Sequence, residues 1–145
     1  MYRCIVLAYD SSREGARALR EGARIAATCA AKTHLLAVMQ LPAGVAIGEG
    51  FDCGKLVQEA VAHARSVLDL GLTKLRDEYR VEATRHLLCG DPVDRISALA
   101  AEVDADLIVV GHQKRGPLSR WWSTSVGASL IDSAPCSVLI ALKPA

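Results

Sequence analysis

Short apolar runs recur along the chain and alternate with longer segments whose apolar residues are spaced about one helical turn apart. Apolar runs of this length that end at turn residues are typical of strands buried on both faces of a parallel sheet. The pattern predicts strands over residues 3–9, 33–40, 82–89, 105–111 and 136–142. The segments between them predict helices over residues 13–31, 55–79, 93–103 and 126–133.

Residues at the expected helix ends support this division. Ser12 is placed to cap the first helix, and Asp91 followed by Pro92 is placed to start the third. Gly71 is expected to interrupt the long second helix without ending it. Residues 42–52 contain a proline and three glycines, which favour a loop.

Alternating strands and helices in 145 residues, without an internal repeat or a linker, predict a single α/β domain over residues 1–145. Right-handed crossovers make this a doubly wound, Rossmann-like, five-stranded parallel sheet in the order 3-2-1-4-5, with helices on both faces. The third strand is less apolar than the first and is expected near an edge. Ligands of such sheets bind beyond the carboxyl ends of the strands, so residues 112–125 are the first place to look for a site.

Composition narrows the choice of partner. The 17 lysines and arginines nearly balance the 16 aspartates and glutamates, so the net charge does not attract the protein to nucleic acid or to an anionic membrane. No apolar run approaches the ~20 residues of a spanning helix, and the first residues do not resemble a signal peptide, so we expect a cytoplasmic protein. The five cysteines form no C-x-x-C pair, which favours buried or semi-buried thiols over redox or metal roles.

Three motifs follow one another along the chain in a specific order. Asp10 and two serines end the first strand, and Gly90-Asp91-Pro92 follows the third. A terminal motif combines the segment from Asp106 to Gly111 with the segment from Ala134 to Ile140. Together these motifs span essentially the whole chain, and on them the chain resembles the universal stress protein family in its small single-domain form.

Members of that family divide into ATP binders and proteins without evident nucleotide binding. In the binders, glycines after the fourth strand cradle the phosphates, because glycine lets backbone N–H groups approach phosphate oxygens closely. An aspartate after the first strand and a valine late in the second flank the adenosine. The resemblance therefore implies a site for ATP, with Mg²⁺, formed by Asp10, Val38, Val110, Gly111, Lys114, Thr124, Ser125 and Val126.

The glycine pattern of the ATP binders is only partly present in this sequence. Lys114 and Thr124 stand where those binders carry glycine, although Gly116 lies nearby and Ser125 keeps the hydroxyl group. A β-branched threonine tolerates positive φ poorly, so Thr124 must either reshape the loop or block tight phosphate approach. Against this, Lys114 and two arginines bring three positive charges into the same loop.

Ordinary structural roles compete with these assignments. Asp10 is also a typical turn residue at a helix entry, and basic loop residues are also typical of a solvated surface. Of the four histidines, His112 is the best placed for the site, and we expect the others at ordinary strand or helix positions. One of the two adjacent tryptophans is expected to pack over the core.

Three functions are consistent with these observations. The first is a cytoplasmic, dimeric stress-response protein that binds ATP or another adenine nucleotide in a regulatory role. The second is a dimeric protein-interaction module of the same fold without nucleotide. The third is a nucleotide-hydrolysing or nucleotidyl-transferring enzyme, which needs a metal-binding carboxylate near Gly111 and has only Asp10 and Asp91 as candidates.

The catalytic motifs that would favour the enzyme are missing from the sequence. It contains neither a G-x-S-x-G elbow nor a Walker A motif, so we expect no efficient catalysis and at most slow ATP hydrolysis. The resemblance also implies a homodimer formed through the last strand, Ser137 to Leu142. An exposed apolar edge of this kind suits pairing with a second copy.

Overall fold

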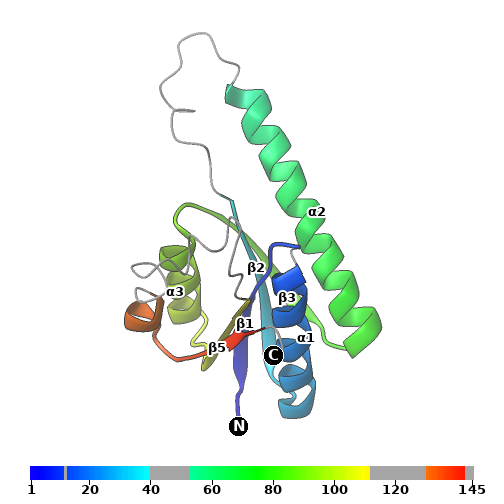
Figure 1. Ribbon diagram of the computed structural model, residues 1–145, viewed down its shortest axis with the longest axis vertical. Coiled ribbons are helices and arrows are strands. Elements are labelled where there is room, and N and C mark those ends of the chain that lie inside the picture. The colour runs from blue at the N-terminus through cyan, green and yellow to red at the C-terminus, as the bar shows by residue number, and fades with distance from the viewer. Residues whose placement is uncertain (12, 40–52, 112–129, 143–145) are drawn as a thin grey trace.

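The computed structural model describes residues 1–11, 13–39, 53–111 and 130–142. Its five parallel strands form one sheet in the order β3-β2-β1-β4-β5 (Figure 1). The strands are β1 (Cys4–Ala8), β2 (Lys32–Met39), β3 (Ala83–Cys89), β4 (Leu107–Gly111) and β5 (Ser137–Ala141). The predicted strand order is confirmed, and so is the expectation that the third strand lies at an edge.

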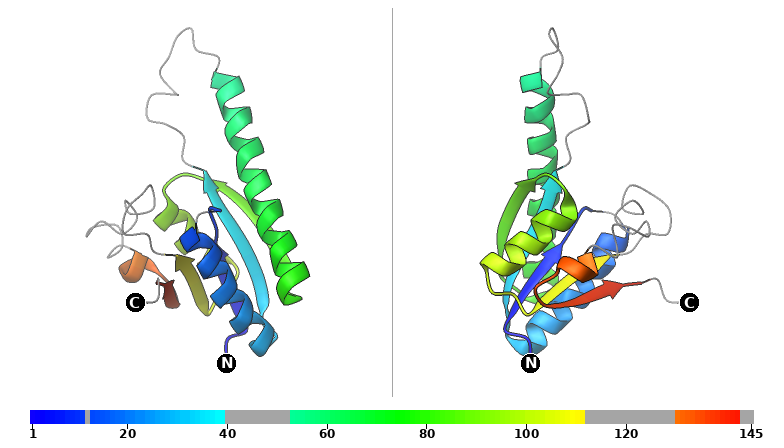
Figure 2. Two further views of the ribbon diagram at one scale, coloured as in Figure 1. Left: turned by 45° about the vertical axis from the view of Figure 1, so that its right-hand side comes forward. Right: turned by 90° about the vertical axis from the view of Figure 1, so that its left-hand side faces the viewer.

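Helices cover both faces of this sheet, as the alternating pattern predicted. They are α1 (Arg13–Cys29), α2 (Cys53–Tyr79) and α3 (Pro92–Glu102), and residues 130–133 are also helical. Figure 2 shows α1 and α2 on one face of the sheet, and α3 with the short helix before β5 on the other. The remainder of the predicted helix over 126–133, and the Ser12 cap, lie outside the described residues.

The two faces carry two separate cores because neighbouring residues of a strand point to opposite sides of the sheet. Ile5 and Leu7 of β1 pack with α1 and α2, whereas Val6 packs with α3. In β4 the same alternation sends Val109 to the first core and Ile108 to the second. All five of these side chains are essentially inaccessible to solvent, which explains why β1 and β4 read as continuous apolar runs.

Gly71 allows α2 to lie close to the sheet. A Cβ atom at this position would stand 2.8 Å from Cδ2 of Leu35 and 2.9 Å from Cδ1 of Tyr9. The helix runs through Gly71 without a break, as expected from the sequence. The glycine therefore serves close packing, which offsets its low intrinsic preference for a helix.

The start of α3 and the entry to β4 are both fixed by aspartates. Asp91 caps α3, where its side chain accepts a hydrogen bond of 3.2 Å from the backbone N–H of Asp94. At the amino end of the sheet, the carboxylate of Asp106 accepts bonds from the backbone N–H groups of Arg3 (2.8 Å) and Cys4 (3.0 Å). Asp106 thus ties the start of β1 to the start of β4.

The cysteines differ in burial more than the sequence suggested. Among the four cysteines whose side chains the structure describes, Cys4 is buried, Cys29 and Cys136 are half-buried, and Cys89 is exposed. All four are free thiols. The expectation of buried or semi-buried thiols was therefore wrong for Cys89, which ends edge strand β3. No helix in the described part of the chain is both long and apolar enough to cross a bilayer.

We expect Asp106→Asn to lower the free energy of unfolding by about 1 kcal/mol at pH 7, because an amide cannot accept both backbone bonds as an ionised carboxylate does. The backbone N–H of Arg3 lowers the pKa of Asp106. The folded pKa is thus depressed, so the contribution is complete above about pH 4 and is lost as the pH falls further. Urea unfolding at pH 7 and pH 3 measures both effects. Asp104→Asn, at an exposed neighbouring position, should change stability little; an equal loss there would contradict this role of Asp106.

Candidate functional site

The candidate site lies at the carboxyl ends of the two central strands. After β1 the chain enters α1 on one face of the sheet, and after β4 it leads to the short helix on the opposite face (Figure 2). Adjacent strands whose connections leave in opposite directions open a crevice at their carboxyl ends, which is where doubly wound sheets bind ligands. Asp10 follows β1 at this point, and Gly111 ends β4.

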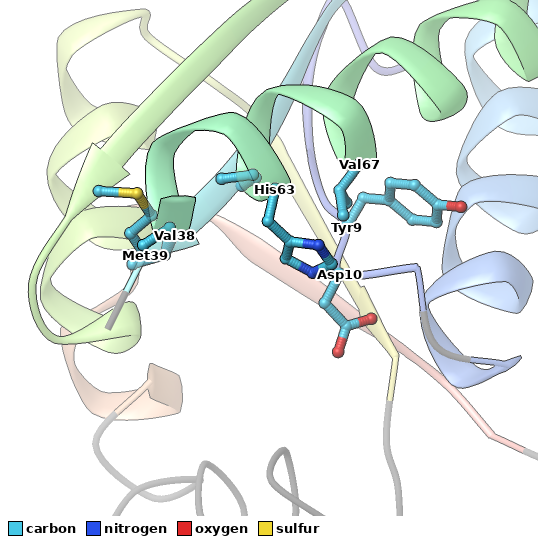
Figure 3. A pocket seen from close by; sticks show the side chains of 9 residues that line it. Tyr9, Asp10, Val38, Met39, His63 and Val67 are labelled. Carbon is cyan, nitrogen blue, oxygen red and sulfur yellow. The ribbon is translucent and has the colours of Figure 1, made fainter. Parts of the chain in front are cut away.

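A cavity of about 230 Å³ opens beside this crevice, between the ends of β1 and β2 and the inner face of α2 (Figure 3). Drug-sized ligands usually occupy about 300–1,000 Å³, so this cavity has room for one ring system and its immediate substituents. It is lined by Tyr9, Asp10, Ala37, Val38, Met39, Ala60, His63, Ala64 and Val67. A wider hollow of about 470 Å³, lined by Arg76, Asp77, Arg80 and Glu82, lacks such apolar walls.

Two polar side chains converge on the otherwise apolar cavity. The carboxylate of Asp10 is half-buried, and Figure 3 shows the exposed imidazole of His63 extending from α2 toward it. Tyr9 is 4% exposed, and burial, followed by the negative charge of Asp10, raises the pKa of its phenol. The tyrosine is therefore a neutral hydroxyl at physiological pH. Apolar walls with a few convergent polar groups are typical of small-molecule sites.

Gly111 has a structural role that the sequence did not reveal. A Cβ atom there would lie 2.3 Å from the backbone oxygen of Glu14 and 2.9 Å from the backbone nitrogen of Gly15. The first turn of α1 therefore touches the end of β4 directly. Glycine is required at this position for helix packing, whether or not a ligand also approaches it.

The structure brings together only part of the site expected from the sequence. Asp10 and Val38 line the cavity. Val110 is 1% exposed and packs into the core under α3, so its side chain is part of the fold and not of the cavity wall. Lys114, Thr124, Ser125, Val126 and the other residues of the basic loop lie outside the described residues, as does the loop over residues 42–52.

Sequence reasoning missed His63, which lines the cavity from α2. A signal was present: Ala60, Ala64 and Val67 follow the helical spacing of a face that packs on the sheet, and His63 falls within the same stripe. A histidine in such an apolar stripe, where the helix passes the ends of the strands, indicates a polar side chain directed at the site. No group of three His, Cys, Asp or Glu residues in the described part of the chain could hold a metal ion.

Comparison with known proteins agrees with this architecture. The model of the universal stress protein family matches residues 1–141. A universal stress protein of Methanocaldococcus jannaschii is 28% identical over an alignment 145 positions long, which covers 99% of this chain and 84% of that protein. The solved structure of the universal stress protein from Archaeoglobus fulgidus in complex with dAMP is 27% identical, with a TM-score of 0.68 over 96% of this chain and 97% of that one. A universal stress protein solved in complex with cAMP is 26% identical, with a TM-score of 0.67 over 96% of each chain.

The sheet order defines a doubly wound α/β domain with a crevice between β1 and β4, and the cavity lies beside this crevice, at the ends of β1 and β2. The family model covers nearly the whole chain, and the solved family members share its fold from end to end. The chain belongs to the universal stress protein family.

We expect Gly111→Ala to lower the free energy of unfolding by about 1–3 kcal/mol, since the added methyl group meets backbone atoms of α1 that no side-chain rotation can move aside. Thermal or urea unfolding measures this loss. Gly54→Ala, at an exposed position of α2, is the matched control and should stabilise slightly, by about 0.5–1 kcal/mol. A Gly111→Ala protein as stable as the wild type would contradict the packing role.

Proposed function

We propose that this universal stress protein binds an adenine nucleotide, with the base in the cavity between β1, β2 and α2 and the ribose beside Asp10. The observation that carries the proposal is the position of Asp10 and Val38 on one cavity at the strand ends. Two family members similar to this chain along their length were solved with dAMP and with cAMP. We further propose a regulatory role in the cytoplasmic stress response.

The chemistry of the cavity suits a nucleoside. Val38 and Val67 offer apolar contact to the faces of a flat base. The carboxylate of Asp10 accepts hydrogen bonds, which suits a ribose hydroxyl or an exocyclic amine as donor. His63 can donate or accept at the same ligand, depending on its tautomer. A cavity of about 230 Å³ has no room for the phosphates, and we propose that they lie outside it, toward the end of β4 at Gly111.

The number of phosphates depends on the residues after Gly111. The nucleotides in the two similar structures each carry a single phosphate. ATP with Mg²⁺ needs more stabilisation of negative charge, and we propose that Lys114 and the arginines of the same loop supply it in place of the glycines. Ser125 adds a hydroxyl, and Thr124 limits how closely the backbone approaches the phosphates.

A second candidate function is a protein-interaction module that binds no nucleotide. Lys114 and Thr124, in place of two glycines, favour it. The packing role of Gly111 also favours it, because the contact with α1 explains this glycine without a phosphate. In both functions we propose a homodimer through the segment from Ser137 to Leu142, since β5 is an edge strand and Leu142 is 60% exposed.

We expect AMP or ATP with Mg²⁺, at about one hundred times its dissociation constant, to stabilise the wild type by about 2.7 kcal/mol, or roughly 5–10 °C in Tm. Asp10→Asn should lose most of this shift, because the amide is a weaker acceptor than the carboxylate. Asp77→Asn, at an exposed position of α2 away from the cavity, is the control and should keep the shift. Absence of any shift at millimolar nucleotide would favour the interaction module.

Variants of His63 refine the same titration. His63→Ala should weaken binding about tenfold, the equivalent of one hydrogen bond, whereas His63→Gln should keep most of the affinity. Equal binding by His63→Ala and wild type would remove His63 from the site without affecting the nucleotide proposal itself.

We expect analytical ultracentrifugation to show twice the 15.4 kDa mass of one chain. Leu142→Asp should shift the equilibrium toward monomer, because it places a charge at the proposed interface. Ile131→Asp alters an equally exposed side chain, 61% against 60% for Leu142, on the helix before β5 and should leave the dimer intact. A monomeric wild type at micromolar concentration would contradict the dimer.

A further inference from the structure

Two histidines, the buried His34 and the half-buried His86, form a pair between β2 and its neighbour, edge strand β3. Nδ1 of His34 lies 2.9 Å from Nε2 of His86, and the ring centroids are 5.1 Å apart. The pair lies on the face of the sheet that α3 covers, because Leu36 and Leu88, two residues further along each strand, belong to the core under α3. The site proposed for nucleotide does not include this pair.

His34 is the more deeply buried member of the pair. His34 is only 3% exposed, and its Nε2 makes no hydrogen bond within the described part of the chain. Its partners across the sheet are Val6 of β1 and Thr84 of β3. The charged groups that act on the pair are Lys32 of β2 and Glu102 of α3. On β1 the titratable group on this face is the thiol of Cys4, which donates to the backbone oxygen of Val103 and whose pKa is raised by burial.

The hydrogen bond determines where the protons of the neutral pair reside. A buried N–H without an acceptor is costly, whereas a bare ring nitrogen is less so. The favourable arrangement therefore places the proton of His34 on Nδ1, from which it donates to Nε2 of His86. Nε2 of His34 then carries a lone pair and no proton, and this buried atom has no hydrogen-bond partner within the described residues.

Uptake of a proton disrupts this arrangement wherever the proton binds. A proton on Nε2 of His34 creates a buried N–H with no acceptor. A proton on Nε2 of His86 makes that atom a donor, so Nδ1 of His34 must become the acceptor and His34 must hold its own proton on Nε2, with the same result. In both cases a positive charge also enters a partly desolvated site, where Lys32 opposes a charge on His34 and Glu102 favours a charge on His86.

The direction of both pKa shifts agrees with this geometry. Burial is the largest cause of the lowered pKa of His34, followed by the charges of His86 and Lys32. Burial also lowers the pKa of His86, and Glu102 opposes that shift without cancelling it. A metal ion is a poor alternative occupant, because the described residues offer no third ligand.

We propose that the His34–His86 pair is an acid-sensitive latch, which holds edge strand β3 and helix α3 to the rest of the sheet when neutral and releases them when protonated. β3 is the part of the sheet best suited to such release, because it pairs with β2 alone. Its side chains are also less buried than those of β1, β2 and β4.

The sign of the pH dependence follows from linkage. The folded pKa values of both histidines lie below about 6.5, the ordinary value in an unfolded chain, so the unfolded state binds more protons as the pH falls. Stability due to the pair is complete above about pH 6.5 and is lost below it. The unfolding equilibrium constant should rise by up to tenfold per pH unit for each proton, and so by up to a hundredfold per pH unit for the pair.

Urea unfolding between pH 8 and pH 5 tests this dependence. We compare the wild type with His34→Leu/His86→Leu, which replaces both rings by apolar groups of similar size. His63→Gln, which removes an exposed histidine of α2 outside the pair, is the control for the pH dependence. The double variant should lose most of the rise in unfolding constant below pH 6.5, and the control should retain it. Equal pH dependence in the wild type and the double variant would overturn the proposal.

Hydrogen exchange of the wild type tests the latch without depending on a variant that folds. After correction for the intrinsic exchange rate, amides of residues 83–102 should lose protection between pH 7 and pH 5.5 before those of β1 and β4 do. Loss of protection that is uniform, or that begins elsewhere in the sheet, would overturn the proposal. The test is independent of nucleotide binding, so its outcome does not depend on the proposed function.

Discussion

The close approach of α1 to the two central strands is the constraint on which the rest of this structure depends. β1 and β4 are covered on both faces, and the ends of β4 are fixed by two different contacts. Asp106 ties its start to the backbone of Arg3 and Cys4, and Gly111 lets the first turn of α1 rest on its end. These contacts bring Asp10, at the end of β1, next to the end of β4.

The same packing limits how a ligand can approach. On the side of Gly111 where a side chain would project, the space is filled by the backbone of Glu14 and Gly15. A phosphate therefore cannot occupy that side of Gly111. The glycine that resembles a phosphate-binding residue in the sequence is thus first a packing residue. For this reason the cavity formed by β1, β2 and α2 is better evidence for a ligand than the glycine is.

The fold could be predicted from the sequence because its signals are local. The apolar runs of β1 and β4, the Asp91-Pro92 start of α3 and the helical stripe of α2 each depend on residues close together in the chain. Of the residues that the family resemblance implies for the site, Asp10 and Val38 line the cavity. The helical stripe of α2 includes His63, but the cavity that His63 reaches depends on how α2 packs on the sheet. His34 meets His86 through the register of β2 with β3, which no local pattern encodes.

Strand β2 connects the His34–His86 pair with the cavity. Its buried half carries His34, and its carboxyl end supplies Val38 and Met39 to the cavity. Met39 is held by β3, because it pairs with Cys89 and its backbone oxygen accepts a bond of 3.0 Å from the N–H of Gly90. Release of β3 by protonation of the histidine pair would remove that partner from the cavity wall. An acid-sensitive contact at the edge of the sheet would therefore change the shape of the cavity through a single hydrogen-bonded strand pair, although the histidines do not line the cavity.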